Sequence, residues 1–82
     1  MARTVTKILK EMKTLRENIK KLKGGMRNGD MIAKMAVQAN VQGFTECAQE
    51  LMKFDADDPE IEANRSKIAK LIKWGKTEIP NL

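Results

Sequence analysis

The chain has 82 residues, of which 41% are hydrophobic and 33% are charged, and its formal net charge is +5. It contains one Cys, no His and no Tyr. A chain this short buries only about 60% of the surface that its unfolded form exposes, so we expect it to gain stability from self-association or from a partner. Because histidine is the most frequent general base and metal ligand, we expect no enzymatic activity, catalytic residue, metal site, cofactor or small-molecule substrate.

Charged residues recur every few positions over the first twenty residues, and no uncharged apolar stretch approaches the roughly 18 residues that span a bilayer. We therefore expect no export signal, and a membrane role is disfavoured. The single Cys47 has no partner for an intramolecular disulfide, which favours a reducing compartment. We expect Cys47 to be buried and the protein to be cytoplasmic, in the host cytoplasm or the virion if its origin is a phage or a virus.

The chain begins with two predicted helices, and the fold class is therefore expected to be all-α. The first helix spans about residues 4–23 and stops at Gly24-Gly25. Residues 24–29 are predicted to form a glycine hinge. The second helix spans about residues 30–54, with its first residue, an aspartate, as the N-cap.

A third helix is predicted over about residues 58–75. It begins with Asp58 as the N-cap and Pro59 at the first helical position. Because the second and third helices are joined by a short connection, we expect residues 30–75 to form an antiparallel helical hairpin. Residues 76–82 are predicted to be a tail, and the whole chain is expected to be one small helical domain.

Residues 1–23 are predicted to form a basic heptad helix, because their apolar residues alternate in spacings of three and four. This predicted partner-binding seam consists of Val5, Ile8, Met12, Leu15, Ile19 and Leu22. About three heptads are marginal for an isolated coil, so packing in a bundle or an oligomer is favoured over a free-standing dimer. Glu11 and Arg16 take g and e positions and are predicted to set register as an ion pair between parallel helices.

The second helix presents one apolar face, and a strip of small residues lies beside that face. The strip consists of Ala36, Ala39 and Gly43, which would let another helix approach closely. Two interpretations stay open. The helix is either the central helix of a three-helix unit or a contact surface in an oligomer.

Charge is segregated along the chain. Residues 1–29 carry a net charge of +7, residues 30–66 carry −5 and residues 67–82 carry +3. This order suits electrostatic pairing between segments or between copies of the chain. The same charge distribution is equally expected if the basic faces only contact solvent and their charge keeps the protein soluble.

The basic first helix is also a candidate for binding nucleic acid through phosphate contacts. The candidate residues are Lys10, Lys13, Arg16, Lys20, Lys21, Lys23, Arg27, Lys67, Lys70 and Trp74. Trp74 shares a side of the third predicted helix with Lys67 and Lys70, as expected for an aromatic ring among cations. A Trp near a helix end also commonly covers a core, and basic residues are common on the outside of coiled-coil helices.

Together these observations favour a non-enzymatic structural or adaptor protein. We expect it to act through helix-mediated self-association or by docking on a larger assembly, a role that would suit a phage or viral component. The alternative is a small charged regulator that binds nucleic acid through the basic N-terminal helix or binds the charged site of a partner protein. The expected partner is therefore a second copy of the chain or a larger protein assembly, and in the alternative a nucleic acid.

Overall fold

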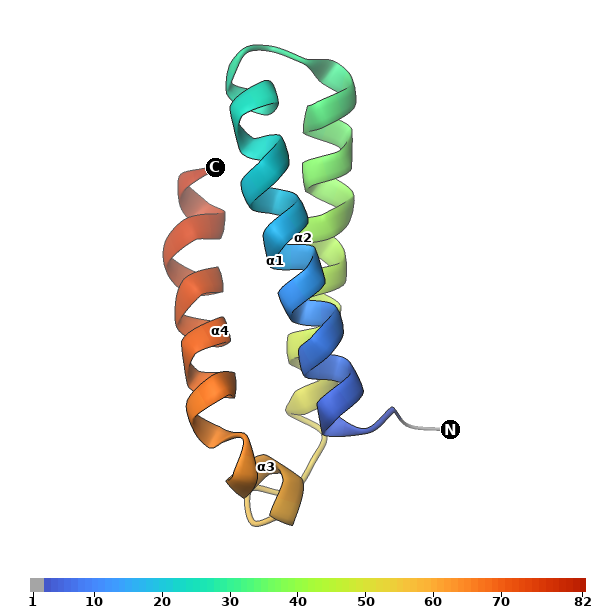
Figure 1. Cartoon of the computed structure of the whole chain (residues 1–82), viewed down its shortest axis with the longest axis vertical. Coiled ribbons are helices and arrows are strands. Elements are labelled where there is room, and N and C mark those ends of the chain that lie inside the picture. The colour runs from blue at the N-terminus through green and yellow to red at the C-terminus, as the bar shows by residue number, and fades with distance from the viewer. Residues whose placement is uncertain (1–2) are drawn as a thin grey trace.

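A computed structural model describes residues 3–82, and over this range the chain contains helices and turns but no strand (Figure 1). The elements are α1 (Val5–Arg27), α2 (Met31–Leu51), α3 (Pro59–Ala63), α4 (Arg65–Glu78) and the 3₁₀ helix η1 (Ile79–Asn81). The all-α prediction is confirmed, although four α-helices are found where three were predicted. α1 and α2 form an antiparallel pair, and α4 runs back alongside them, antiparallel to α2 (Figure 1).

In the short turn between α1 and α2, the backbone polar groups form hydrogen bonds with neighbouring residues. Gly29 adopts a φ of 86°, a left-handed conformation that favours glycine. Its backbone N–H donates to the carbonyl of Met26, and the N–H of Asp30 donates to the carbonyl of Gly25, which together form a Schellman motif. The Asp30 carboxylate then accepts hydrogen bonds from the N–H groups of Ile32 and Ala33, at 2.9 and 3.2 Å. Asp30 is therefore the N-cap of α2, as predicted.

The predicted glycine hinge over residues 24–29 is too long, because α1 continues through Gly24 and Gly25 to Arg27. A Cβ atom on Gly25 would lie 3.1 Å from the Cβ of Ala33 in α2. The absence of a side chain at Gly25 therefore lets the two helices approach closely where they are joined. α2 ends at Leu51, and the residues up to 54 form turns rather than the predicted last turn of helix.

The predicted third helix is divided at Asn64, which leaves the helical conformation at φ −112° and ψ 11°. The side-chain Nδ2 of Asn64 donates to the carbonyl of Glu60, which also accepts the helical hydrogen bond from the backbone N–H of Asn64, and this side-chain bond competes with a regular helix. Asp58 accepts a hydrogen bond from the N–H of Glu60 at 2.9 Å, which confirms the predicted N-cap. Helical structure also reaches Asn81, so the predicted tail over residues 76–82 is mostly helical.

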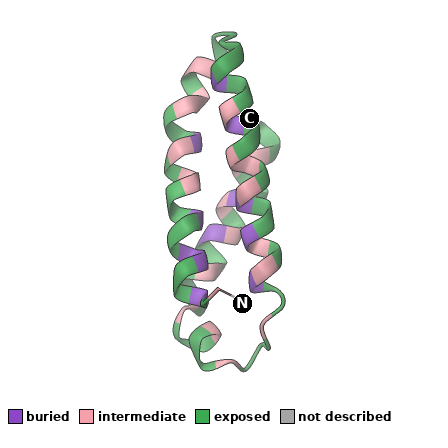
Figure 2. Ribbon diagram, turned by 90° about the vertical axis from the view of Figure 1, so that its right-hand side faces the viewer, coloured by how far each residue is buried: buried purple, intermediate pink, exposed green. Residues whose placement is uncertain are grey.

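The core forms where α1 meets α2 and α4, and buried residues lie on the sides of the helices that face one another (Figure 2). α1 and α2 make most of the contacts between helices, and α4 contributes a smaller share. Cys47 of α2 is buried as a free thiol, as predicted. The buried hydrophobic residues are Val5, Ile8, Leu9, Met12, Ile19, Ala33, Val37, Phe44, Cys47, Leu51 and Leu71.

Within residues 3–82, no helix combines the length and the apolar composition that crossing a membrane requires.

Candidate functional site

The predicted seam of α1 lies against the rest of the same chain. Val5, Ile8, Met12 and Ile19 are at most 1% exposed, and Leu15 and Leu22 are half-buried. Four of the six seam side chains therefore already contribute to the internal core. A second copy of the chain would reach them only after the bundle had opened.

The predicted register residues do not meet within the chain. Glu11 forms an ion pair with Arg3, and the Nε of Arg16 lies 3.9 Å from the Oε1 of its neighbour Glu17. That Nε atom is buried and has no hydrogen-bond partner among the described residues. A pairing of Glu11 with Arg16 between two copies stays a prediction.

Arg3 was not singled out from the sequence, yet it joins the start of the chain to α2. Its Nη2 and Nε atoms donate to the two carboxylate oxygens of Glu50, at 2.8 and 3.1 Å, and Nη2 also lies 3.5 Å from the Sγ of Cys47. This two-point contact is the favourable geometry between a guanidinium and a carboxylate. Hydrogen bonding from Arg3 lowers the pKa of Glu50, and the same contact raises the pKa of Arg3.

One face of the bundle, between α2 and α4, carries an open apolar groove of about 490 Å³. It is lined by Phe44, Thr45, Ala48, Met52, Ile72, Gly75, Lys76, Ile79 and Pro80. A second hollow of about 370 Å³ shares Ile79 with the groove and extends along α2. Its other lining residues are Met26, Lys34, Val37, Gln38, Val41, Gln42 and Leu82. We call these two hollows together the α2–α4 groove.

The ring of Phe44, which lines this groove, packs against the ring of Trp74 and holds α4 against α2. Their centroids are 5.3 Å apart and their planes meet at 62°, an edge-to-face arrangement. Gly75 is buried beside Phe44, and a Cβ atom built on it would lie 2.7 Å from the Cε1 of that ring. The chain therefore uses a glycine at the point where α4 comes closest to α2.

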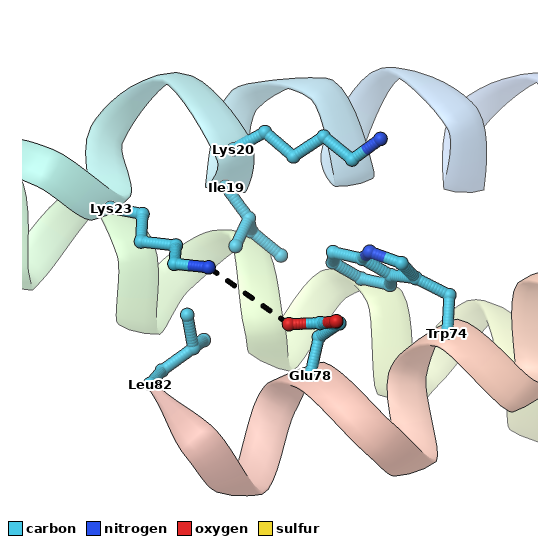
Figure 3. Close-up of a pocket in the computed structure, with 6 residues that line it drawn as sticks. All are labelled: Ile19, Lys20, Lys23, Trp74, Glu78 and Leu82. Carbon is cyan, nitrogen blue, oxygen red and sulfur yellow. Dashed lines mark ion pairs between the residues drawn. The ribbon is translucent and has the colours of Figure 1, made fainter.

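The face between α1 and α4 is hollowed by two clefts of about 150 Å³ each. The first is lined by Ile19, Lys20, Lys23, Trp74, Glu78 and Leu82 (Figure 3). In it, the Nζ of Lys23 lies 3.9 Å from the Oε2 of Glu78, so this lysine has a counterion across the cleft. The second cleft is lined by Thr6, Leu9, Lys10, Lys13, Asn64 and Lys67, and none of these residues is acidic. We call the surface that contains both clefts the α1–α4 face.

The structure thus brings together six of the ten candidate nucleic-acid-binding residues. Lys10, Lys13 and Lys67 share one cleft, and Lys20, Lys23 and Trp74 share the other. Arg16 lies on α1 between these two groups and is half-buried. The remaining candidates, Lys21, Arg27 and Lys70, are exposed and line neither cleft. Trp74 is half-buried, so its ring lines the cleft and also packs against the core.

Among the described residues, no group of three or more His, Cys, Asp and Glu side chains is arranged to hold a metal ion. Comparison of the chain with protein-family models, curated proteins and solved structures gave no match.

Proposed function

We propose that the protein is a non-enzymatic adaptor that binds an acidic amphipathic helix of a partner protein in the α2–α4 groove. The observation that supports this proposal is the groove itself, which is open, largely apolar and lined by two helices. Binding of an amphipathic helix in a groove between helices is a recurrent mode of recognition. Burying the apolar stripe of the ligand against the groove supplies the binding energy.

The spacing of the lining residues supports a helical ligand. On α2 the groove is lined at Thr45, Ala48 and Met52, one turn and two turns apart. On the other side it is lined at Ile72 of α4 and at Ile79, the first residue of η1, seven positions further along. Two parallel rows of side chains at helical spacing form the kind of surface into which the ridges of a third helix pack.

The charge at the groove supports an acidic ligand. Its lining includes Lys34 and Lys76 and neither Asp nor Glu. A second copy of the chain brings a net charge of +5 and a basic α1, so like charges oppose self-association at this surface. An acidic helix from another protein would place carboxylates near both lysines. The attraction between opposite charges would also raise the association rate constant.

The test is titration of the protein with a designed helical peptide of about 20 residues, with Leu at heptad a and d positions and Glu at most others. The readout is the fluorescence of Trp74, the only Trp in the chain, which contacts Phe44, a residue of the groove lining. We expect saturable one-to-one binding. A peptide of the same composition in shuffled order, which lacks the apolar stripe, is expected to bind at least tenfold more weakly.

Two variants of α2 supply the matched comparison. Thr45→Glu places a carboxylate at an exposed position inside the groove, whereas Gln49→Glu places one a turn further along, outside its lining. We expect the first to weaken peptide binding at least tenfold and the second to change it less than twofold. Equal binding of the two peptides would overturn the proposal. The proposal would also be overturned if the original protein were a dimer in solution and Thr45→Glu made it a monomer, because a second copy would then occupy the groove.

A further inference from the structure

The α1–α4 face meets the groove at Leu82, which lines both, but it has a different chemistry. In one of its clefts, Lys10 and Lys13 of α1 face Lys67 of α4, and the other lining residues are uncharged. None of these three lysines forms an ion pair within residues 3–82. Lysines of two helices therefore share one cleft without a counterion from the protein.

The row of cations continues along α1, where the lysines have acidic neighbours. Lys20 and Lys23 line the second cleft beside Trp74; the Nζ of Lys20 lies 3.9 Å from the Oε1 of Glu17, and Glu78 offsets part of the charge of Lys23. Arg16 lies between the two clefts, and its buried Nε has no hydrogen-bond partner among the described residues. At 1.5 Å per residue, the cations from Lys10 to Lys23 extend over about 20 Å of helix. This basic row is long enough to follow several phosphates of a nucleic-acid backbone.

We propose that the α1–α4 face binds the phosphate backbone of nucleic acid without sequence preference. Ammonium groups that converge on one cleft repel one another, and a polyanion that lies along the row replaces this repulsion with attraction. The contacts are to phosphate, because lysine ammonium groups act as point charges on phosphate and the one arginine of the row is half-buried. Trp74 adds an aromatic ring at the end of the row, where a base of a single strand stacks.

Two other anionic partners fit this face less well. Lipid surfaces are bound by helices that insert apolar side chains, but Leu9 and Ile19 in these clefts are at most 4% exposed, and Trp74 and Leu82 are half-buried. An acidic peptide supplies carboxylates at irregular positions, whereas a nucleic acid supplies one charge per nucleotide along a regular backbone. Nucleic acid therefore matches the length and regularity of the basic row best.

The test is binding of the full chain to fluorescently labelled oligonucleotides, one single-stranded and one duplex, at several salt concentrations. If the five cleft lysines each contact one phosphate, the logarithm of the association constant falls against the logarithm of salt concentration with a slope of about −3.5 for a single strand or −4.5 for a duplex. Quenching of Trp74 by the single strand alone would place a base at the ring. Absence of binding at low salt, near 50 mM, would overturn the proposal.

Two triple variants distinguish the contribution of the α1–α4 face to binding from the contribution of the net charge of the protein. Lys10→Gln, Lys13→Gln and Lys67→Gln remove the lysines of one cleft. The control set, Lys7→Gln, Lys53→Gln and Lys73→Gln, removes three exposed lysines that line neither these clefts nor the groove. The first set is expected to weaken single-strand binding about 100-fold at 0.1 M salt, because three counterions fewer are released. The second set is expected to weaken it less than threefold.

Circular dichroism shows whether both triple variants keep the helical content of the original protein. Equal weakening by the two sets would overturn the assignment of binding to this face, because only net charge would then matter. Tighter binding of polyglutamate than of an oligonucleotide of similar length would overturn the choice of nucleic acid and point to an acidic protein.

Discussion

Replacement of Gly75 by alanine tests how closely α4 approaches α2. Gly75 is buried, and a Cβ atom on it would lie 2.7 Å from the Cε1 of Phe44. That ring is itself only 3% exposed and rests edge-to-face on Trp74. The ring therefore has little room to move away, and α4 must shift outward to accept the methyl group.

The expected magnitude combines two opposing effects. Overpacking a well-packed core costs about 1–3 kcal/mol. Replacing a helical glycine by alanine contributes about 0.5–1 kcal/mol of stability. We therefore expect Gly75→Ala to lower the free energy of unfolding by about 1–2 kcal/mol.

Gly24 offers the matched control because it is also inside a helix, yet no atom lies within 4 Å of its added Cβ. Gly24→Ala is expected to raise the free energy of unfolding by about 0.5–1 kcal/mol. The two variants should then differ by roughly 10 °C in midpoint temperature, since about 1 kcal/mol shifts a domain of this size by 4–8 °C. Thermal unfolding followed by circular dichroism measures both values. If Gly75→Ala were as stable as Gly24→Ala, the close approach of α4 to Phe44 would be refuted.

Three further predictions concern the core, the Arg3 contact and the cap of α2. Ile8→Ala is expected to cost about 2–5 kcal/mol of unfolding free energy in urea titration, whereas Ile32→Ala, at a position 81% exposed, should stay within about 0.5 kcal/mol. Because Arg3 lowers the folded-state pKa of Glu50, their contact stabilises the fold above the ordinary glutamate pKa near 4.5 and loses this effect as the pH falls through the folded value. The urea midpoint of Glu50→Gln should therefore fall less between pH 7 and pH 3 than that of the original protein, and an equal fall would contradict the assignment. Asp30→Ala should cost about 1 kcal/mol by removing the N-cap, and an unchanged midpoint would show that the carboxylate bonds are dispensable.

The sequence predicted the helical class and two helix starts because these depend on neighbouring residues. Asp30 and Asp58 cap α2 and α3 through backbone groups two or three residues away, so the sequence pattern contains the whole interaction. The break at Asn64 is also local, and an amide residue inside an apparent helix was the available signal. The close contact at Gly25 was not predictable in this way, because it is made with Ala33 of the next helix.

The two surfaces of α4 depend on contacts between distant parts of the chain. Lys10 and Lys67 line the same cleft although 57 positions separate them, and periodicity within one helix carries no information on such a pairing. Arg3 and Glu50 are separated in the same way, by 47 positions. The heptad pattern of α1 correctly marked an apolar face, but a pattern alone does not distinguish burial within the chain from burial against another.

The uneven packing of the helices sets the order in which the molecule opens. α1 and α2 are adjacent in sequence and hold most of the contacts, whereas α4 contributes only Leu71 and Gly75 as buried residues within the described range. Amide hydrogens of α4 should therefore exchange with solvent through partial opening, while those in the middle of α1 exchange only when the whole molecule unfolds. Since α4 lines both the groove and the basic face, each ligand that holds it in place would slow this exchange and strengthen binding of the other.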